Sequence, residues 1–174
     1  APQKGSAAKQ KSDSLTRAER NTLLRVARTT LEAGLSGKPL PDLPKPAGHL
    51  KEQRGAFVTL HKDGRLRGCI GTFYPDKPLI EVIRETAISS ALHDNRFPPV
   101  DASELDRIQI EISVLTVPKP VSGPEEIVLG RDGIIVRQGR RSGTYLPQVA
   151  TETGWTVEEF LSHCAAEKAK IAPD

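Results

Sequence analysis

The chain has 174 residues, of which 37% are hydrophobic and 27% charged, a composition typical of one globular domain or two small subdomains. No run of about eighteen apolar residues occurs, which argues against a transmembrane helix and membrane association. The formal net charge is +3, but residues 1–13 hold three lysines against Asp13, so the rest of the chain is nearly neutral and nucleic-acid binding is disfavoured.

Residues 1–13 are small, polar and basic, and we expect a disordered tail because they bury too little apolar surface to offset their ordering entropy. The tail contains no apolar stretch of the kind found in a secretory signal. Cys69 and Cys164 are too few for a disulfide framework or a four-cysteine zinc site. We therefore expect reduced thiols, a cytoplasmic location, and no metal or other cofactor.

We expect residues 14–172 to form one domain. A helix is predicted from Thr16 to Gly34 or Gly37, because Thr16 and Glu19 have capping-box spacing and apolar residues recur at helical spacing. Four prolines between 38 and 47 then predict an extended connection.

Two β-prone stretches, 55–60 and 65–72, flank Asp63-Gly64, which favours a two-residue hairpin turn. A helix opened by prolines is predicted over about 75–92. Strict alternation of apolar and polar residues over 107–116 then predicts a half-buried strand of an antiparallel sheet.

The last third of the chain contains shorter elements. The sequence predicts a short helix at 124–128, a strand at 134–137, a basic turn at 138–143, and helical segments at 148–152 and 157–168. Helices at both ends with hairpins between them indicate an α+β fold. We expect antiparallel sheets with flanking helices, in two subdomains that share a core.

The hairpin turn also predicts which residues face each other. With two residues in the turn, Cys69 opposes Val58. Successive residues of a strand point to opposite faces, so Cys69 and His61 lie on different faces. Barring a bulge, His61 is therefore not the base for Cys69.

Gly68 and Gly71 flank Cys69, and glycine inside a strand marks a bulge or a close approach by a ligand or another backbone. With Arg67 on the same face, Cys69 has the setting of a nucleophile. The alternative is that Cys69 is a small buried apolar residue and that the glycines make room for a packed helix.

A second candidate group, residues 93–99, follows the second predicted helix. Asp94 and Arg96 have the chemistry to orient a carboxylate or phosphate, and His93 to exchange protons near neutral pH. The alternative is that Asp94 caps the backbone and Phe97 anchors the turn in the core.

Arg140 and Arg141 form a third candidate, a basic turn that either binds an anion or is simply solvated. His163 and Cys164 are expected at a helix contact, since their neighbours do not complete a metal site. His49 is expected on the surface. The chain has no P-loop, no dinucleotide-binding glycine motif and no hydrolase or zinc-protease motif.

Residues 66–71 read Leu-Arg-Gly-Cys-Ile-Gly and closely resemble the six-residue hallmark of the AMMECR-one domain family. Further similar stretches follow in order at 94–99, 108–114, 133–136, 143–149 and 155–161. The resemblance covers about residues 15–170, and a chain of this size looks like the bacterial form, AmmeMemoRadiSam system protein A. One departure is Glu167-Lys-Ala-Lys170, where many relatives have Lys-Ala-Gly.

The resemblance implies a two-part α+β fold with antiparallel sheets. It also implies two partners, a MEMO-like protein and a radical S-adenosylmethionine protein. It implies no oligomeric state.

Two functions follow from these observations. The first is an enzyme or enzyme component acting on a small anionic substrate, whose catalytic candidates are Cys69, His93 and Arg67. The second is a binding module that docks a partner, with RNA binding a weaker alternative. The candidates for contact with a substrate or partner are Leu66, Gly68, Ile70, Gly71, Asp94, Arg96, Arg140 and Arg141.

Overall fold

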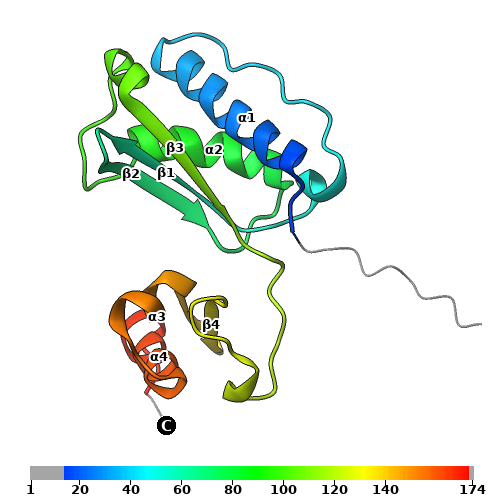
Figure 1. Ribbon diagram of the computed structural model, residues 1–174, viewed down its shortest axis with the longest axis vertical. Helices are drawn as coiled ribbons and strands as arrows, with labels where there is room; N and C mark the ends of the chain where they lie inside the picture. Colours follow the sequence, from blue (N-terminus) through cyan, green and yellow to red (C-terminus); the bar gives the residue numbers. More distant parts are fainter. Residues whose placement is uncertain (1–13, 173–174) are drawn as a thin grey trace, which may run out of the picture. The chain divides into compact units, whose positions relative to one another are not determined.

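The computed structural model describes residues 14–172, so the tail expected at 1–13 lies outside the described residues (Figure 1). The chain divides into two compact units between Val117 and Pro118. Each unit combines helices with an antiparallel sheet, which confirms the predicted α+β class. Within residues 14–172, no helix combines the length and the apolar character needed to cross a membrane.

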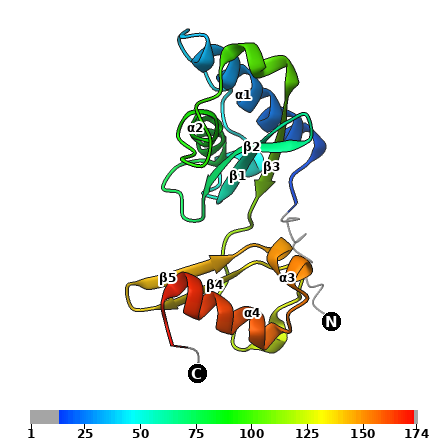
Figure 2. The same cartoon turned by 90° about the vertical axis from the view of Figure 1, so that its left-hand side faces the viewer.

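The first unit is built on a three-stranded sheet with the order β2-β1-β3, in which both neighbouring pairs are antiparallel. Its strands are β1 (Ala56–Lys62), β2 (Arg65–Thr72) and β3 (Ile108–Val114). The helices α1 (Arg17–Leu35) and α2 (Leu79–Leu92) pack on the sheet (Figure 2). Two short 3-10 turns, Gly48–Lys51 and Ala102–Arg107, complete the unit.

The two helices of the first unit begin with different N-cap residues. Thr16 and Glu19 form the predicted capping box of α1, each side chain bonding the other residue's backbone N–H. Pro78, one of the residues predicted to open the second helix, is its N-cap, and the helix begins at Leu79.

The core of the first unit lies on one face of the sheet. Ala56, Val58 and Leu60 point from β1 toward the two helices and are fully buried. The helices meet them with apolar residues at helical spacing, such as Leu23 and Leu31 of α1. The alternating residues of β1 point to the other face, which neither helix of this unit covers, and are only partly buried.

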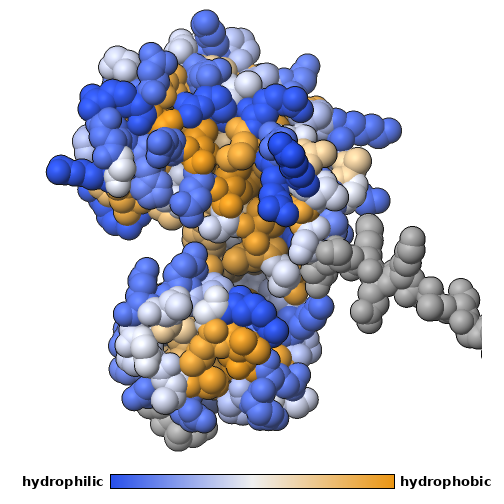
Figure 3. Space-filling view, in the orientation of Figure 1, coloured by the Kyte–Doolittle hydropathy of each residue, from blue (hydrophilic) through white to orange (hydrophobic). Residues whose placement is uncertain are grey.

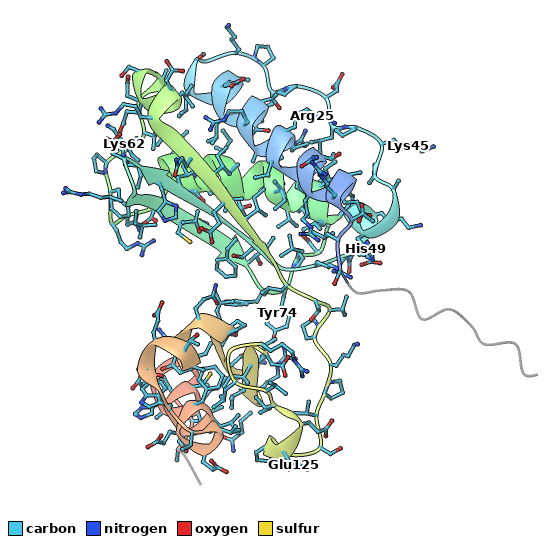
Figure 4. All side chains as sticks on the ribbon, viewed as in Figure 1. Arg25, Lys45, His49, Lys62, Tyr74 and Glu125 are labelled. Atoms are coloured by element: carbon cyan, nitrogen blue, oxygen red, sulfur yellow. The ribbon has the colours of Figure 1, made fainter. Side chains whose placement is uncertain are left out.

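His49 is buried, so the expectation that it lies on the surface is wrong. Its backbone N–H donates to Oε1 of Glu19 at 2.9 Å, and its Nδ1 lies 3.0 Å from Oε2. Figure 4 shows His49 beside the first turn of α1. The pair therefore ties the proline-rich connection to α1. Burial raises the pKa of Glu19, but hydrogen bonds from His49 and Thr16 outweigh it and lower the pKa to about 2.

The second unit packs a hairpin against helices. Its elements are the 3-10 turn Pro124–Glu126, the strands β4 (Ile134–Gln138) and β5 (Arg141–Tyr145), and the helices α3 (Pro147–Thr153) and α4 (Val157–His163). The helix predicted over 157–168 is continuous, but its winding changes to π-helical over Cys164–Ala169. Phe160 stacks on Tyr145 with ring centroids 5.5 Å apart.

Each unit has its own hydrophobic core. In the first unit, one cluster joins α1, α2 and the inner face of the sheet. In the second, Phe160 and Cys164 are fully buried against β4 and β5, and a smaller cluster surrounds Ala169. Within each unit, the apolar face of the sheet is covered by helices of that same unit.

Candidate functional site

The hairpin that carries Cys69 contains a β-bulge. The strands β1 and β2 pair in the predicted register next to the turn, and then shift by one residue at Arg67, beyond His61. Cys69 therefore opposes Thr59, so the predicted pairing with Val58 is wrong. The shift also places Cys69 and His61 on the same face of the sheet, in place of the opposite faces that a regular hairpin gives.

Arg67 is the extra residue of the bulge, and its side chain is almost fully buried against the segment that follows α2. Its Nη1 and Nη2 donate to the carbonyl oxygens of Pro98 and Pro99 at 2.8 and 3.3 Å. Its Nε and Nη2 donate to the carboxylate of Glu104 at 3.1 and 2.9 Å. These donors face protein groups, so the geometry does not support the role in catalysis or substrate binding expected for Arg67.

Glu104 is the centre of this ion network. Its carboxylate accepts hydrogen bonds from Arg67 and from Nζ of Lys62, the latter at 2.5 Å, and is itself mostly buried. The bonds from Arg67 and Lys62 outweigh the cost of burial and lower the pKa of Glu104 to about 2. The network clamps the bulge to the 3-10 turn before β3.

Gly68 lies under the last turns of α2. A Cβ at this position would collide with the backbone carbonyl of Ser90. The hydroxyl of Ser90 donates to the carbonyl of Val58 at 2.7 Å and accepts the N–H of Ile70 at 2.9 Å. The hydroxyl thus bridges β1 and β2, and the glycine allows the helix to come this close.

Gly71 has a different neighbour. The space that its Cβ would occupy is filled by the ring of Phe57 and the carbonyl oxygen of Ala56. Phe57 also packs edge-to-face on Phe73, with ring centroids 4.9 Å apart. The alternative in which glycines make room for packing groups is therefore seen at both flanking glycines.

Cys69 itself is partly exposed and held through its backbone. Its N–H donates to Oδ2 of Asp94 at 2.9 Å, and its carbonyl accepts from Nη2 of Arg96 at 3.3 Å. Its Sγ lies 3.2 Å from Oγ1 of Thr59. The segment after α2 and the cysteine strand therefore come together, as the first hypothesis requires.

Asp94 and Arg96 form a bidentate ion pair beside Cys69. Nε and Nη2 of Arg96 donate to Oδ1 and Oδ2 of Asp94 at 2.9 and 2.7 Å. The guanidinium holds the pKa of Asp94 far below its usual range. The pKa of Arg96 is raised, chiefly by the bonds to Asp94, with a smaller effect of the negative charge of a Cys69 thiolate. The side chain of Asp94 is buried, whereas that of Arg96 is 58% exposed.

The remaining predicted residues differ in exposure and in the unit to which they belong. His93 is exposed at the C-cap of α2, next to Asp94. Leu66 is 40% exposed, while Ile70 is half-buried. Arg140 and Arg141 belong to the hairpin of the second unit, where Nη1 of Arg141 donates to the carbonyl of Lys170 at 2.9 Å.

Three residues of the site were not predicted from the sequence: Thr59, His61 and Ser90. The first two were placed on the wrong face because the bulge has no unambiguous signal in the sequence. Ser90 had a weak signal, a hydroxyl within the otherwise apolar buried stripe of α2.

Cys164 lies in the core of the second unit as a helix contact, and burial raises the pKa of its thiol to about 11. His163 stacks on Trp155 with ring centroids 4.1 Å apart and lies 3.0 Å from Glu167. Within residues 14–172 no three His, Cys, Asp or Glu side chains come together as metal ligands.

Comparison with known proteins gives a consistent family. The AMMECR1 family model matches residues 24–174. Protein MK0488 of Methanopyrus kandleri is 51% identical over 172 residues, covering 93% of this chain and 82% of its own length. A protein of Methanothermobacter thermautotrophicus is 47% identical over 167 residues, covering 92% of this chain and 86% of its own length.

A solved structure is also similar. Uncharacterized protein PH0010 from Pyrococcus horikoshii matches with a TM-score of 0.71 and 43% identity, covering 87% of this chain and 79% of its own. These three relatives come from archaea, so they do not support the more specific assignment to the bacterial form. The chain belongs to the AMMECR1 family.

Proposed function

We propose that this protein is an enzyme, or a subunit of one, whose reactive group is the Cys69 thiol and whose substrate is a small anionic electrophile. The observation that carries the proposal is the position of Sγ. It lies on the sheet face that α1 and α2 leave uncovered, 3.2 Å from the Thr59 hydroxyl. Cys69 is partly exposed, and the Arg96 guanidinium donates to its backbone carbonyl.

The surroundings of Cys69 are rigid, which suits a reacting group. Asp94 and Arg96 hold the two backbone polar groups of Cys69 that point away from β1. On the other face, Gly68 is pressed against α2. A thiol fixed in this way needs no reorganisation before it attacks a bound substrate.

Arg96 is the residue proposed to hold the negative charge of the substrate. Nε and Nη2 are bonded to Asp94, so the guanidinium is oriented, yet more than half of the side chain is exposed. A planar guanidinium matches a carboxylate or a phosphate group. Arg67 is buried and engaged by Glu104, so this proposal assigns the anion to Arg96 alone.

The proposed chemistry is nucleophilic displacement at an electrophilic carbon, such as an acyl carbon. The Cys69 thiolate donates an electron pair and forms the S–C bond, while the leaving group departs with the pair of the broken bond and takes a proton from a histidine. Water then attacks the same carbon, gives its proton back to the histidine and releases the thiolate. His61, on the face of the thiol, and His93, beside Asp94, are the two candidates for this histidine.

The proposal includes a cytoplasmic location, where thiols stay reduced. It also includes action together with a MEMO-like protein and a radical S-adenosylmethionine protein, as for AmmeMemoRadiSam system protein A. The family resemblance supports this part.

A second candidate function is docking of a partner at the same face. Leu66 and Tyr74 are 40% and 49% exposed, and the Phe57–Phe73 pair lies next to Gly71. Exposed aromatic and aliphatic side chains of this kind are common where proteins meet. A docking function needs the shape of this surface but not a reactive thiol.

The experiment that separates the two functions is alkylation of the folded chain with iodoacetamide over about pH 5 to 10, each cysteine being followed by peptide mass. Cys164 is the internal comparison, because it is buried and its pKa is raised to about 11. We expect Cys69 to react at least about tenfold faster than Cys164. A Cys69 that stays unmodified until the protein unfolds contradicts the enzyme and leaves docking.

Variants of arginine refine the test. Arg96→Gln is expected to slow the reaction of Cys69 with iodoacetate, whereas Arg96→Lys preserves it, because the positive charge attracts the carboxylate of this reagent. Arg65→Gln, at an exposed arginine on the same hairpin, is the matched control and should leave the rate unchanged. Equal effects of Arg96→Gln and Arg65→Gln would remove Arg96 from the proposal.

A further inference from the structure

The two edges of the sheet in the first unit differ. At the β2 edge, the bulge at Arg67 interrupts the strand, and Asp94 and Arg96 occupy the outward N–H and C=O of Cys69. Bulges and side-chain caps of this kind prevent another strand from pairing. The β2 edge therefore cannot pair with a further strand.

The β3 edge is open over most of its length. The N–H of Leu115 donates to the carbonyl of Gly55, so residues at odd positions of β3 direct their backbone groups toward β1 and residues at even positions direct them outward. Arg28 of α1 occupies the outward carbonyl of Ile108 at 2.6 Å. Among residues 14–172, no bond is seen to the outward backbone groups of Ile110, Ile112 and Val114.

An apolar groove runs along this open edge. It has a volume of about 530 Å³ and lies between β3 and the first half of α1. In Figure 3 hydrophobic residues form a stripe over the same two elements. The apolar residues that line the groove are Leu15, Leu23, Leu24, Ile110, Ile112 and Val114.

We propose that β3 accepts an extended, acidic peptide of another protein as a fourth, antiparallel strand. Its backbone bonds the outward groups of β3, and every second side chain lies in the groove against α1. This is the arrangement of strand addition between an edge strand and a helix, in which main-chain bonds give affinity and alternating pockets give specificity.

Charge indicates the acidic character of the peptide. Helix α1 carries four arginines, Arg17, Arg20, Arg25 and Arg28, against two acidic residues, Glu19 and Glu32, and Glu19 is already paired with His49. The charged residues that line the groove are Arg20, Arg54 and Glu111. Arg20 lines the groove, and Arg28 lies at the start of β3. Acidic residues at both ends of a bound strand therefore meet positive charge.

Two other occupants match less well. Ser14 lines the groove and follows residues 1–13 in the sequence, but these residues carry a net charge of +2 and no apolar side chain larger than alanine or proline. A second copy pairing through β3 would bring its own α1 into the space beside the first. That helix is rich in arginine, so the juxtaposition of two copies would bring like charges together.

The surface is separate from the Cys69 site, because β2 and β3 are opposite edges of the sheet. The probe for the test is a fluorescein-labelled peptide, Asp-Glu-Val-Thr-Ile-Thr-Val-Glu-Asp, whose Val, Ile and Val alternate as the groove requires. One control peptide has lysine at every acidic position. A second carries N-methyl groups on Val, Ile and Val, which removes the donors that face β3.

Binding is measured by fluorescence anisotropy with the full chain. We expect saturable binding of the acidic peptide, and at least about tenfold weaker binding of both control peptides. In the bound state, hydrogen exchange of the Ile110, Ile112 and Val114 amides should slow, while that of the Glu111 and Ser113 amides, already turned to β1, should not change.

Variants of the chain locate the peptide. Leu24→Asp, in the groove, is expected to weaken binding about tenfold, whereas Leu40→Asp, at a similarly exposed leucine outside it, should not. Ile112→Pro removes an outward N–H that β1 does not use, so the sheet should persist by circular dichroism while binding is lost.

Three results would overturn the proposal. They are absence of saturable binding up to about 1 mM peptide, equal binding of the N-methylated peptide, and a dimer in sedimentation that Ile112→Pro abolishes. The last would assign the edge to a second copy of the chain.

Discussion

The backbone carbonyl of Ser90 occupies the space that a Cβ at Gly68 would need. This contact presses α2 onto β2 directly beside Cys69, and the Ser90 hydroxyl bridges the two strands at the same point. Much of the Leu-Arg-Gly-Cys-Ile-Gly segment is thereby explained by packing. Within it, Cys69 is the residue whose side chain the packing leaves available on the uncovered face.

Replacing Gly68 by alanine tests this packing. Gly68→Ala is expected to destabilise the first unit by about 2–3 kcal/mol, because the new methyl group meets the helix backbone and not a flexible side chain. Unfolding in urea, followed by hydrogen exchange of β2 amides, measures the change. Trp155, the single tryptophan, lies in the second unit, so its fluorescence is an internal reference that should shift less. Cys69→Ala, at the next residue, should be far milder, and equal stability of the two variants would contradict the close contact.

Removing the Ser90 hydroxyl leaves two backbone groups unpaired. Ser90→Ala is expected to cost about 1–3 kcal/mol, since the N–H of Ile70 and the carbonyl of Val58 lose their shared partner in a buried position. The exchange rate of the Ile70 amide should rise with it. Ser89→Ala, one residue earlier on a less buried position of α2, is the control. A protected Ile70 amide in Ser90→Ala would show that β1 and β2 close the gap without the hydroxyl.

The Glu104 network makes stability depend on pH. The folded pKa of Glu104 is about 2, below the ordinary value of 4.5, so the ionised carboxylate stabilises the fold at pH values above 4.5. This stabilisation is lost as the pH falls from about 4.5 to about 2. We expect Glu104→Gln to be less stable than the unmodified chain by up to about 3 kcal/mol at pH 7, with the difference shrinking at pH 3. Urea titrations at the two pH values measure it, and a gap that is independent of pH would mean that Glu104 acts through packing.

The Glu19–His49 contact controls the proline-rich connection. Glu19→Gln is expected to speed exchange of the His49 amide about tenfold at pH 7, because that amide donates to the Glu19 carboxylate. In the unmodified chain the folded pKa of Glu19 is about 2, so protection is complete above 4.5 and fades as the pH falls toward 2. Glu32→Gln, at an exposed acidic residue of α1, should change neither the exchange rate of the His49 amide nor its dependence on pH. The same acceleration in Glu32→Gln would indicate a general effect of charge on the helix.

Local patterns predicted the elements of the fold. The predicted capping box at Thr16 begins α1, and the alternation over 107–116 is the strand β3. These signals are local, because a cap or a strand face depends on residues within a few positions. Of the two prolines predicted to open α2, Pro78 is the N-cap.

The candidate site was predicted in part. The segments of Cys69 and Asp94 were both recognised, and the structure joins them through a hydrogen bond between the Cys69 N–H and Asp94. Arg67 and Arg96 were both predicted to belong to the site. Each pairs with a carboxylate, but Arg67 is mostly buried against Glu104, which is distant in sequence, whereas Arg96 pairs with the neighbouring Asp94 and stays exposed.

The sequence by itself determined the order of the elements, the alternation of the strands and the family of the chain. Only the tertiary structure decided the register of the hairpin beyond its turn. The bulge shifts the register by one residue and turns Cys69 to the opposite face of the sheet. Contacts with residues outside the hairpin stabilise it, namely those of Arg67 with Glu104 and of Gly68 with Ser90. Those partners lie more than twenty residues away along the chain, so no local pattern could have placed the thiol beside Thr59 and Arg96.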